Sequence, residues 1–188
     1  PDPDPTPDPD PAPTPDPTPT PDPEPEPVYY TVTYMDGDQT VTTQRVKADT
    51  AATEPTAETV DENWPAVPVG NKLTWYNDAK PYDFGTPVTE DLTLTAVIGS
   101  ADFQAGNGTE DYPYLIGNAA QFEAIDNLST QMAAGQSFNF ELTNDIDYTT
   151  ATKYINNFCG ILDGNSHAIR ISESSGNALI ASTSGSVT

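Results

Sequence analysis

The pattern of hydrophobic and polar positions between residues 107 and 171 predicts an extended entry, one short helix and two strand-like segments. A helix is predicted from residue 118 onward, because Asn118 can serve as its N-cap and Gln121 stands three residues later, as in a capping box. Apolar side chains then recur at helical spacing on one stripe, formed by Phe122, Ile125, Leu128 and Met132. The residues just before the helix, 112–116, are expected to be extended.

Two segments after this helix alternate with the two-residue period of a strand. The positions that share a face are Phe138, Phe140 and Leu142 in the first segment, and Phe158, Gly160 and Leu162 in the second. Each segment ends in Asp, Asn and Gly residues that tolerate left-handed backbone, at 144–145 and 163–165. A helix followed by short strands with such turns predicts the capped start of a stacked parallel solenoid.

Four further stretches, within residues 29–97, read as strands: YYTVTYM, VTTQRVK, KLTWY and LTLTAV. Turn dipeptides follow the first and the third, at Asp36–Gly37 and Asn77–Asp78. The stretch from 48 to 68 lacks periodicity and contains three prolines. Strands rich in β-branched residues with one irregular crossover predict a small β or α+β module.

The first 27 residues have a different pattern, with proline at every odd position. Each intervening residue precedes a proline and is driven toward extended backbone. Half of the amide donors are absent, so neither a helix nor a sheet can form. A disordered polyproline II rod of about 80 Å is predicted, at roughly 3.1 Å per residue. We interpret it as a spacer in preference to a docking motif, which gives three domains: 1–27, 28–99 and 100–188.

The charge of −23, with only six basic residues, changes the range of possible partners. It excludes binding to rows of phosphates in nucleic acids and disfavours anionic membrane surfaces. No apolar run has the length of a membrane span, so no membrane insertion is expected. The single cysteine excludes an internal disulfide framework. Low cysteine with abundant Thr, Asp and Asn fits an exported bacterial protein. The start at Pro1, without a signal peptide, is interpreted as that of a mature fragment.

The C-terminal part resembles a known family of surface proteins. GTEDYPYLI, the helix with QFEAI, FELTNDIDY and F-x-G-x-L-D-G-N-x-H-x-I resemble the opening of the right-handed β-helix in bacterial surface proteins with GLUG-type repeats. NALIASTSGSVT is similar to the core of that repeat, with Ala178 and Ala181 in place of the usual glycines. The resemblance covers about residues 105–188. It implies secretion or surface display, in adhesins and in accessory regions of large surface enzymes, with further rungs after Thr188.

The middle part resembles the Listeria–Bacteroides repeat, which is related to internalin B-repeats. The motifs are YTVTYMDG, a V-x-A stretch before EPTAE, and LTWYNDAKPYDFGTPVTEDLTLTAV. The closest matches are Trp75–Tyr76, Asp83–Phe84, Pro87–Val88–Thr89, Asp91, Leu92, Thr93, Leu94 and Ala96. Departures are Thr74 where glycine precedes tryptophan, a longer crossover containing Trp64, and Val97 where Lys-Trp often ends the repeat. The resemblance implies a compact β-grasp-like surface module, within the range of small domains.

No catalytic motif stands out. G-x-S-x-G, H-E-x-x-H, C-x-x-C and a glycine-rich phosphate loop are absent. His167 is interpreted as a turn or rung residue in preference to a general base, and Cys159 as a small apolar residue. Asp145 and Asp147 share a face at strand spacing, as a glycan-cleaving pair could. We favour instead the capping of backbone amides, and assign no catalytic residue.

Metal and cofactor sites are not expected either. Asp36 with Asp38, and Glu110 with Asp111, could bind Ca²⁺ weakly. Calcium sites need six or more oxygen ligands, and no full ligand loop is present. We therefore expect neither a metal site nor a cofactor.

Aromatic residues offer a different functional surface. They gather in the second half of the middle module, as Trp64, Trp75, Tyr76, Tyr82 and Phe84. Exposed aromatics could stack on sugar rings or on a protein partner. Trp75 and Phe84 are preferred as core residues, and Trp64 is left open between core and surface. The candidates for binding are Trp64, Tyr76 and Tyr82.

These patterns together predict a mainly β protein with a disordered tail, a β-grasp-like module, and the start of a right-handed parallel β-helix with one capping α-helix. The expected function is non-catalytic adhesion or display at the surface or cell wall of a bacterium, within a larger secreted protein. The partner would be a host or bacterial surface glycan or protein. The alternative is a fragment of a carbohydrate-active β-helix enzyme, or an accessory region of a large surface peptidase. An enzyme would need more rungs and a second carboxylate or histidine cluster beyond Thr188.

Overall fold

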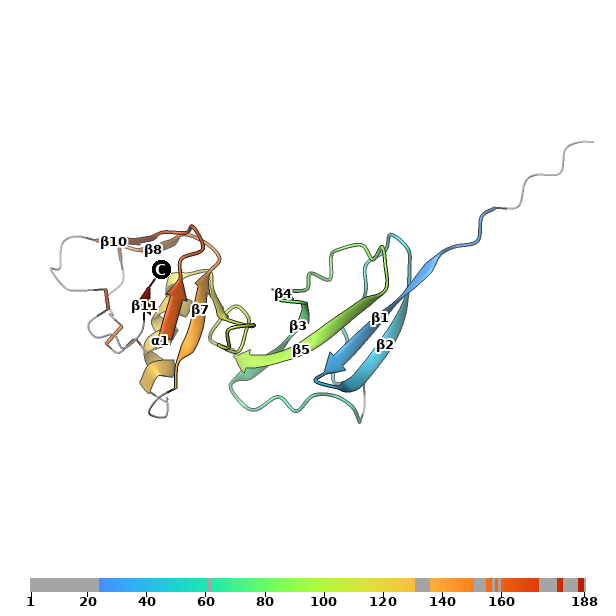
Figure 1. Ribbon diagram of the computed structural model, residues 1–188, viewed down its shortest axis with the longest axis horizontal. Helices are drawn as coiled ribbons and strands as arrows, with labels where there is room; N and C mark the ends of the chain where they lie inside the picture. Colours follow the sequence, from blue (N-terminus) through green and yellow to red (C-terminus); the bar gives the residue numbers. More distant parts are fainter. Residues whose placement is uncertain are drawn as a thin grey trace, which may run out of the picture.

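The computed structural model describes residues 24–60, 62–130, 136–150, 155–156, 158, 160–172, 179–180 and 186–187. Over these residues the protein is mainly β with one short helix, which confirms the expected class. Two β-rich units lie next to each other along the long axis of the molecule (Figure 1). The first unit ends with the strand that reaches Ser100, and the second contains the described residues after it.

The first unit is a five-stranded sheet with the order β2-β1-β5-β3-β4. Its strands are β1 (Tyr29–Asp36), β2 (Gln39–Lys47), β3 (Asn71–Asn77), β4 (Lys80–Pro81) and β5 (Leu92–Ser100). β1 and β2 form an antiparallel hairpin, β3 pairs antiparallel with both β4 and β5, and β1 pairs parallel with β5. The four strands expected from alternation are confirmed, and the two-residue β4 is an addition.

One face of this sheet carries the core of the first unit. Val32 and Tyr34 of β1, Trp75 of β3 and Leu94 of β5 are all buried there. The ring of Tyr34 meets that of Trp75 edge-on, with centroids 4.9 Å apart. The predicted burial of Trp75, which is 1% exposed, is therefore confirmed. The crossover between β2 and β3, without regular periodicity, adds buried apolar residues to the same core.

The second unit is built from parallel strands. One sheet has the order β11-β9-β7-β6, and a second pairs β10 with β8. The strands are β6 (Tyr114–Ile116), β7 (Phe138–Leu142), β8 (Ile146–Tyr148), β9 (Gly160–Asp163), β10 (Ile169–Ile171) and β11 (Ser186–Val187). A parallel bridge between Ile155 and Ile180 forms a third position of pairing. Successive passes of the chain thus lie in register at three positions, and we call this arrangement the parallel stack.

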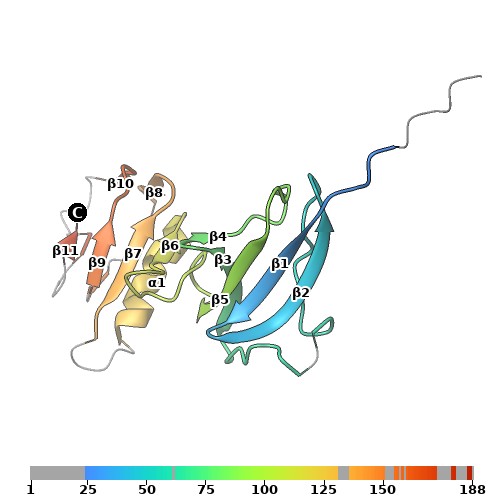
Figure 2. The ribbon, with the colours of Figure 1, turned by 45° about the vertical axis from the view of Figure 1, so that its right-hand side comes forward.

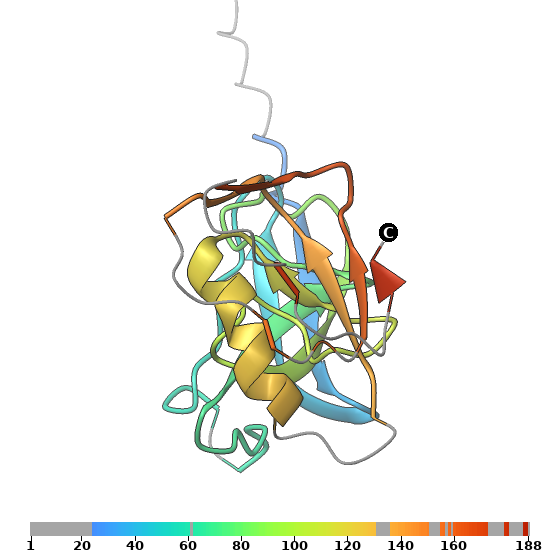
Figure 3. The same ribbon diagram turned by 90° about the vertical axis from the view of Figure 1, so that its left-hand side faces the viewer.

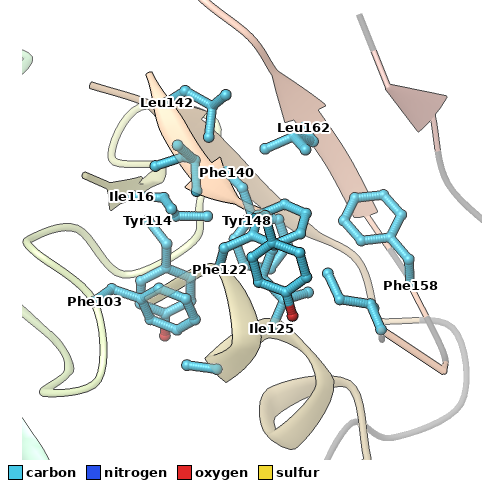
Figure 4. Close-up of a cluster of buried hydrophobic side chains, with 13 residues drawn as sticks. Phe103, Tyr114, Ile116, Phe122, Ile125, Phe140, Leu142, Tyr148, Phe158 and Leu162 are labelled. Atoms are coloured by element: carbon cyan, nitrogen blue, oxygen red, sulfur yellow. The ribbon is translucent and has the colours of Figure 1, made fainter. Parts of the chain in front are cut away.

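The register of the parallel stack explains its alternating pattern. Phe140 of β7 lies beside Tyr114 of β6 and Leu162 of β9, and all three are buried. Figure 4 shows these side chains converging with others from α1 and β8. The predicted inward faces of both strand segments are confirmed, with Phe138 only half-buried at the margin. FNFELTNDIDY, however, contains two strands, β7 and β8, that belong to different sheets.

The helix α1 (Ala119–Thr130) packs onto this core, and Figure 3 shows it beside the strands of the stack. Asn118 Oδ1 accepts a hydrogen bond from the Gln121 amide at 3.0 Å, which confirms the predicted N-cap. The side chain of Gln121 accepts from the Gly117 amide at 2.7 Å, one residue before the position expected for a capping box. Phe122 and Ile125 are fully buried, whereas Met132 lies outside the described residues.

The two units meet at a joint on the face of β3 and β5 that lies opposite the first core. Tyr76 of β3 and Val97 of β5 are buried there against Ala105, with Tyr112 and Leu115 packed around them. The rings of Tyr76 and Tyr112 are 5.1 Å apart in an edge-on arrangement. Because strand side chains alternate between faces, Trp75 and Tyr76 serve different cores.

Backbone contacts tighten the same joint. The Ala101 amide donates to the carbonyl of Gly70 at 2.9 Å. The ammonium of Lys72 donates to the carbonyl of Gln104 at 2.8 Å. A Cβ at Gly99 would collide with the carbonyl oxygen of Gly106, so only glycine permits this approach. The chain therefore leaves β5 along a path that is fixed against β3.

Several expectations fall outside the described residues. These include most of the predicted proline-rich rod, residues 1–23, and Cys159. Residues 24–28 carry no regular secondary structure and are exposed, and the carbonyl of Val28 accepts from the Ala48 amide at 2.8 Å. In the described part of the chain, no helix combines the length and apolar character needed to cross a bilayer.

Candidate binding surface

The hairpin between β3 and β4 shapes a hollow of about 520 Å³, which we call the hairpin hollow. It is lined by Asn77, Asp78, Ala79, Lys80, Pro81, Tyr82, Asp83 and Thr86. Asp78 adopts a φ of 52° at the turn, as the Asn-Asp dipeptide permits. The Tyr82 amide donates to the carbonyl of Trp75 at 2.8 Å, which ties the outgoing chain to β3. Asp83 closes the next turn by accepting from the Gly85 amide at 2.8 Å.

Tyr82 supplies the aromatic surface of the hairpin hollow. Its ring is half-buried, meets Phe84 edge-on at 5.0 Å and packs at the margin of the first core. Burial, followed by the charge of Asp83, raises the pKa of the Tyr82 phenol. The hydroxyl is buried and has no hydrogen-bond partner among the residues that the structure describes. The exposed part of the ring, beside the amide, carboxylate, ammonium and hydroxyl groups of the lining, suits a ligand that presents both apolar faces and hydroxyls.

The other two binding candidates are Trp64 and Tyr76. Trp64 is half-buried and packs edge-on against Trp75 at a centroid distance of 6.3 Å, so it belongs to the margin of the first core. Tyr76 is 1% exposed and lies in the joint. Burial, with Glu141 and Tyr112 as smaller causes, raises the pKa of Tyr76 to about 12. Tyr76 is therefore no candidate for stacking at the surface, and it lies in a different cluster from Trp64 and Tyr82, which both pack at the margin of the first core.

A second hollow, of about 220 Å³, lies between β2 and the crossover. Its lining comprises Tyr34, Thr42, Thr43, Gln44, Thr53, Glu54, Pro55, Thr59 and Val60. The Tyr34 hydroxyl donates to the carbonyl of Thr53 at 3.0 Å, and the Gln44 side chain accepts from the Thr53 amide at 3.0 Å. Sequence reasoning missed this hollow because the crossover has no periodicity. These polar groups are engaged in holding the crossover onto the sheet.

Asp145 and Asp147 both accept hydrogen bonds from backbone amides. Asp145 Oδ1 accepts from the Ala168 amide of the next pass at 3.1 Å, and lies 3.4 Å from His167 Nδ1. Asp147 Oδ1 accepts from the Thr149 hydroxyl at 2.7 Å and from the Thr149 amide at 3.0 Å. These bonds lower the pKa of each carboxyl, mainly through the Ala168 amide for Asp145 and through the Thr149 hydroxyl for Asp147.

The lowered pKa values bear on the chemistry of the pair. A general acid for glycosidic cleavage needs a carboxyl whose pKa is raised, so that it holds a proton at working pH. Both carboxyls at this position instead favour the charged form. The arrangement matches the capping role, in which each carboxylate secures a turn of the parallel stack.

The carboxylates considered for calcium lie on exposed turns. Asp36 and Asp38 flank the turn of the β1–β2 hairpin, and Glu110 and Asp111 precede β6. Within the residues that the structure describes, no three His, Cys, Asp or Glu side chains gather as they would around a metal ion. His167 lies at the turn before β10, where its amide donates to the carbonyl of Gly164 at 2.7 Å.

Comparison with known proteins gives one partial similarity. No family model matches the chain, and no solved structure matches it. The chain is similar to a segment of Halomucin from Haloquadratum walsbyi, with 40% identity over 93 residues. The aligned region is 44% of this chain and 1% of that protein. The chain therefore spans only about 1% of the length of this much larger relative.

Proposed function

We propose that the chain is a non-catalytic module for adhesion and display at the cell surface, within a larger secreted protein. The observation that carries the proposal is the joining of two β-rich units into one body through a buried, hydrogen-bonded joint. Such a body can hold a binding surface at a fixed orientation. The similarity to a short segment of the much larger Halomucin supports a modular role outside the cell.

We also propose a family of surface modules for each of the two units. The strand order β2-β1-β5-β3-β4, with β1 and β5 parallel, supports a β-grasp-like surface repeat of the Listeria–Bacteroides type. Parallel pairing at three positions, next to a capping helix, supports the start of a right-handed β-helix of the kind that carries GLUG-type repeats. Both families point to display.

We place the binding surface at the hairpin hollow, with Tyr82 as its aromatic platform. The side chains around it mix two carboxylates with an ammonium, an amide and a hydroxyl. A surface glycan, with apolar ring faces and many hydroxyls, fits this mixture better than a strongly charged polymer. A protein loop rich in hydroxyl groups is the other occupant consistent with this chemistry.

The experiment is a screen of host and bacterial surface glycans, followed by titration of the best ligand. We expect Tyr82→Ala to weaken binding about tenfold, as the loss of roughly 1.4 kcal/mol of stacking would. Tyr29→Ala is the matched control, because Tyr29 is 39% exposed at the start of β1, away from the hairpin hollow. Equal losses in both variants would contradict the placement of the site.

The enzyme alternative is tested with the same glycans. New reducing ends would be followed with the unmodified chain, Asp145→Asn and Asp147→Asn. We expect no turnover from any of them, because both carboxylates are engaged as caps. Turnover by the unmodified chain that disappears in both variants would favour a carbohydrate-active enzyme over adhesion.

A further inference from the structure

The chain enters and leaves the first unit at opposite ends of two neighbouring strands. β1 begins at Tyr29, directly after the N-terminal segment, and β5 ends at Ser100, where the chain passes into the second unit. The two strands pair in parallel, from Val32 beside Leu92 to Met35 beside Thr95. Figure 2 shows them side by side along the sheet. Tension along the chain would therefore pull β1 and β5 lengthwise in opposite directions.

This geometry decides how the hydrogen bonds carry a load. When parallel strands are pulled from opposite ends, all bonds between them are stretched together and must fail together. When a hairpin is opened from its free ends, the bonds fail one after another. Simultaneous failure has the higher barrier, and forced unfolding is governed by the rate of crossing that barrier.

Two features reinforce the β1–β5 pair. Val32, Tyr34 and Leu94 are buried under it, so water cannot readily replace its hydrogen bonds as they stretch. Just before the paired residues on both strands, the Thr31 amide donates to Asp91 Oδ1 at 2.7 Å. A bond to a charged acceptor is stronger than one between neutral groups. It adds one more link that is loaded in the same direction.

The far end of β5 is also secured. β5 is the central strand of the sheet and pairs on its other edge with β3, from Asn71 beside Ser100 to Tyr76 beside Thr95. The bonds from Ala101 to Gly70 and from Lys72 to Gln104 tie the outgoing chain to the start of β3. A force that arrives from the second unit is therefore shared by two paired strands before it reaches β1.

We propose that the first unit is a force-bearing module whose resistance comes from the β1–β5 pair and the Thr31–Asp91 bond, together called the shear clamp. The proposal rests on the display function, because only a tethered protein with a bound partner is placed under tension. It adds that the unit stays folded while its partner pulls. The resistance of the first unit to force is a property of the protein alone, so it can be tested without a ligand.

The test is single-molecule force spectroscopy on the full chain carrying Cys159→Ser. One handle is attached at the N-terminus, and the second at a cysteine placed by Asp102→Cys, which loads the shear clamp. The matched control places the second handle by Lys47→Cys, which lies opposite Tyr29 and opens the β1–β2 hairpin from its end. The two unfolding events are identified by the length of chain that each releases, at most roughly 260 Å between residues 29 and 102 and roughly 65 Å between residues 29 and 47, from which the folded separation of the two ends is subtracted.

We expect the rupture force through Asp102→Cys to be at least twice that through Lys47→Cys at the same loading rate. Equal forces in the two geometries would overturn the proposal.

Asp91→Ala should lower the force through Asp102→Cys and leave the force through Lys47→Cys unchanged, with Asp91→Asn restoring part of the loss. An equal fall in both geometries would remove the Thr31–Asp91 bond from the clamp. Failure to bind either a surface glycan or a surface protein would contradict the display function and leave these forces unchanged.

Discussion

At the scale of single residues, the side chains of two neighbours on β3 lie on opposite faces of the sheet. Trp75 points into the first core and Tyr76 into the joint, and each is 1% exposed. The burial of Trp75 could be predicted, because alternation along one strand indicates a core face. The burial of Tyr76 could not, because its cover comes from Tyr112 and Leu115, which follow the strand by more than thirty residues. Alternation along a strand identifies one buried face of the sheet. To predict that the opposite face is also buried, one must know which distant residues pack against it.

The importance of Trp75 can be measured directly. Truncation by Trp75→Ala should lower the free energy of unfolding by about 3–5 kcal/mol, as for other buried aromatic side chains. Urea denaturation followed by circular dichroism gives this value without depending on tryptophan fluorescence. Trp64→Ala, at the margin of the same core, is the control and should cost less. A melting temperature unchanged by Trp75→Ala would refute the role of this side chain.

At the scale of elements, the length of a periodic stretch separates what the sequence predicts from what it does not. β1, β2, β3, β5 and α1 each span at least seven residues and were all expected. β4, β8 and β10 have two or three residues, too few for a period to appear. Their positions depend instead on pairing with distant strands, as Ile146 pairs with Ile169. The hairpin hollow can be predicted only in part, from the turn Asn77–Asp78 and from Tyr82, because its shape arises from the short β4.

The joint between the units depends on the absence of a side chain at Gly99. Gly99→Ala should lower the free energy of unfolding by about 1–3 kcal/mol, because the added Cβ meets the backbone of Gly106, which cannot turn aside. Gly85→Ala is the control, since its Cβ would meet only the end of the Asp83 side chain. Equilibrium unfolding in urea compares the two. Equal stability of both variants would show that the joint can widen without loss.

At the scale of the whole molecule, acidic charge is spread over every part of the chain. The net charge of −23 keeps copies apart in solution and opposes association with other anionic surfaces. This property could be read from composition, and so could the distinct nature of the first 27 residues. The relation of the two units could not, because the contacts of the joint involve backbone groups such as the carbonyls of Gly70 and Gln104. Backbone groups carry no sequence signature.

Removal of residues 1–27 tests whether the folded part is self-sufficient. The truncated chain keeps Val28, whose carbonyl accepts from the Ala48 amide. We expect the same melting temperature and the same dispersed NMR signals as for the full chain, because alternating prolines offer no core-forming residues. A large loss of stability would mean that this segment docks on the folded units.

The register of the parallel stack also sets the order in which the second unit can assemble. Each pairing between passes closes a loop of more than twenty residues, as from Phe138 to Gly160. Closing such a loop costs conformational entropy, and pairing with a strand edge that is already ordered offsets this cost. The strand order β11-β9-β7-β6 makes β6 the edge onto which β7 pairs, and β9 and β11 can then be added in turn. This order is also the order of synthesis, so each strand is synthesised after the strand with which it pairs.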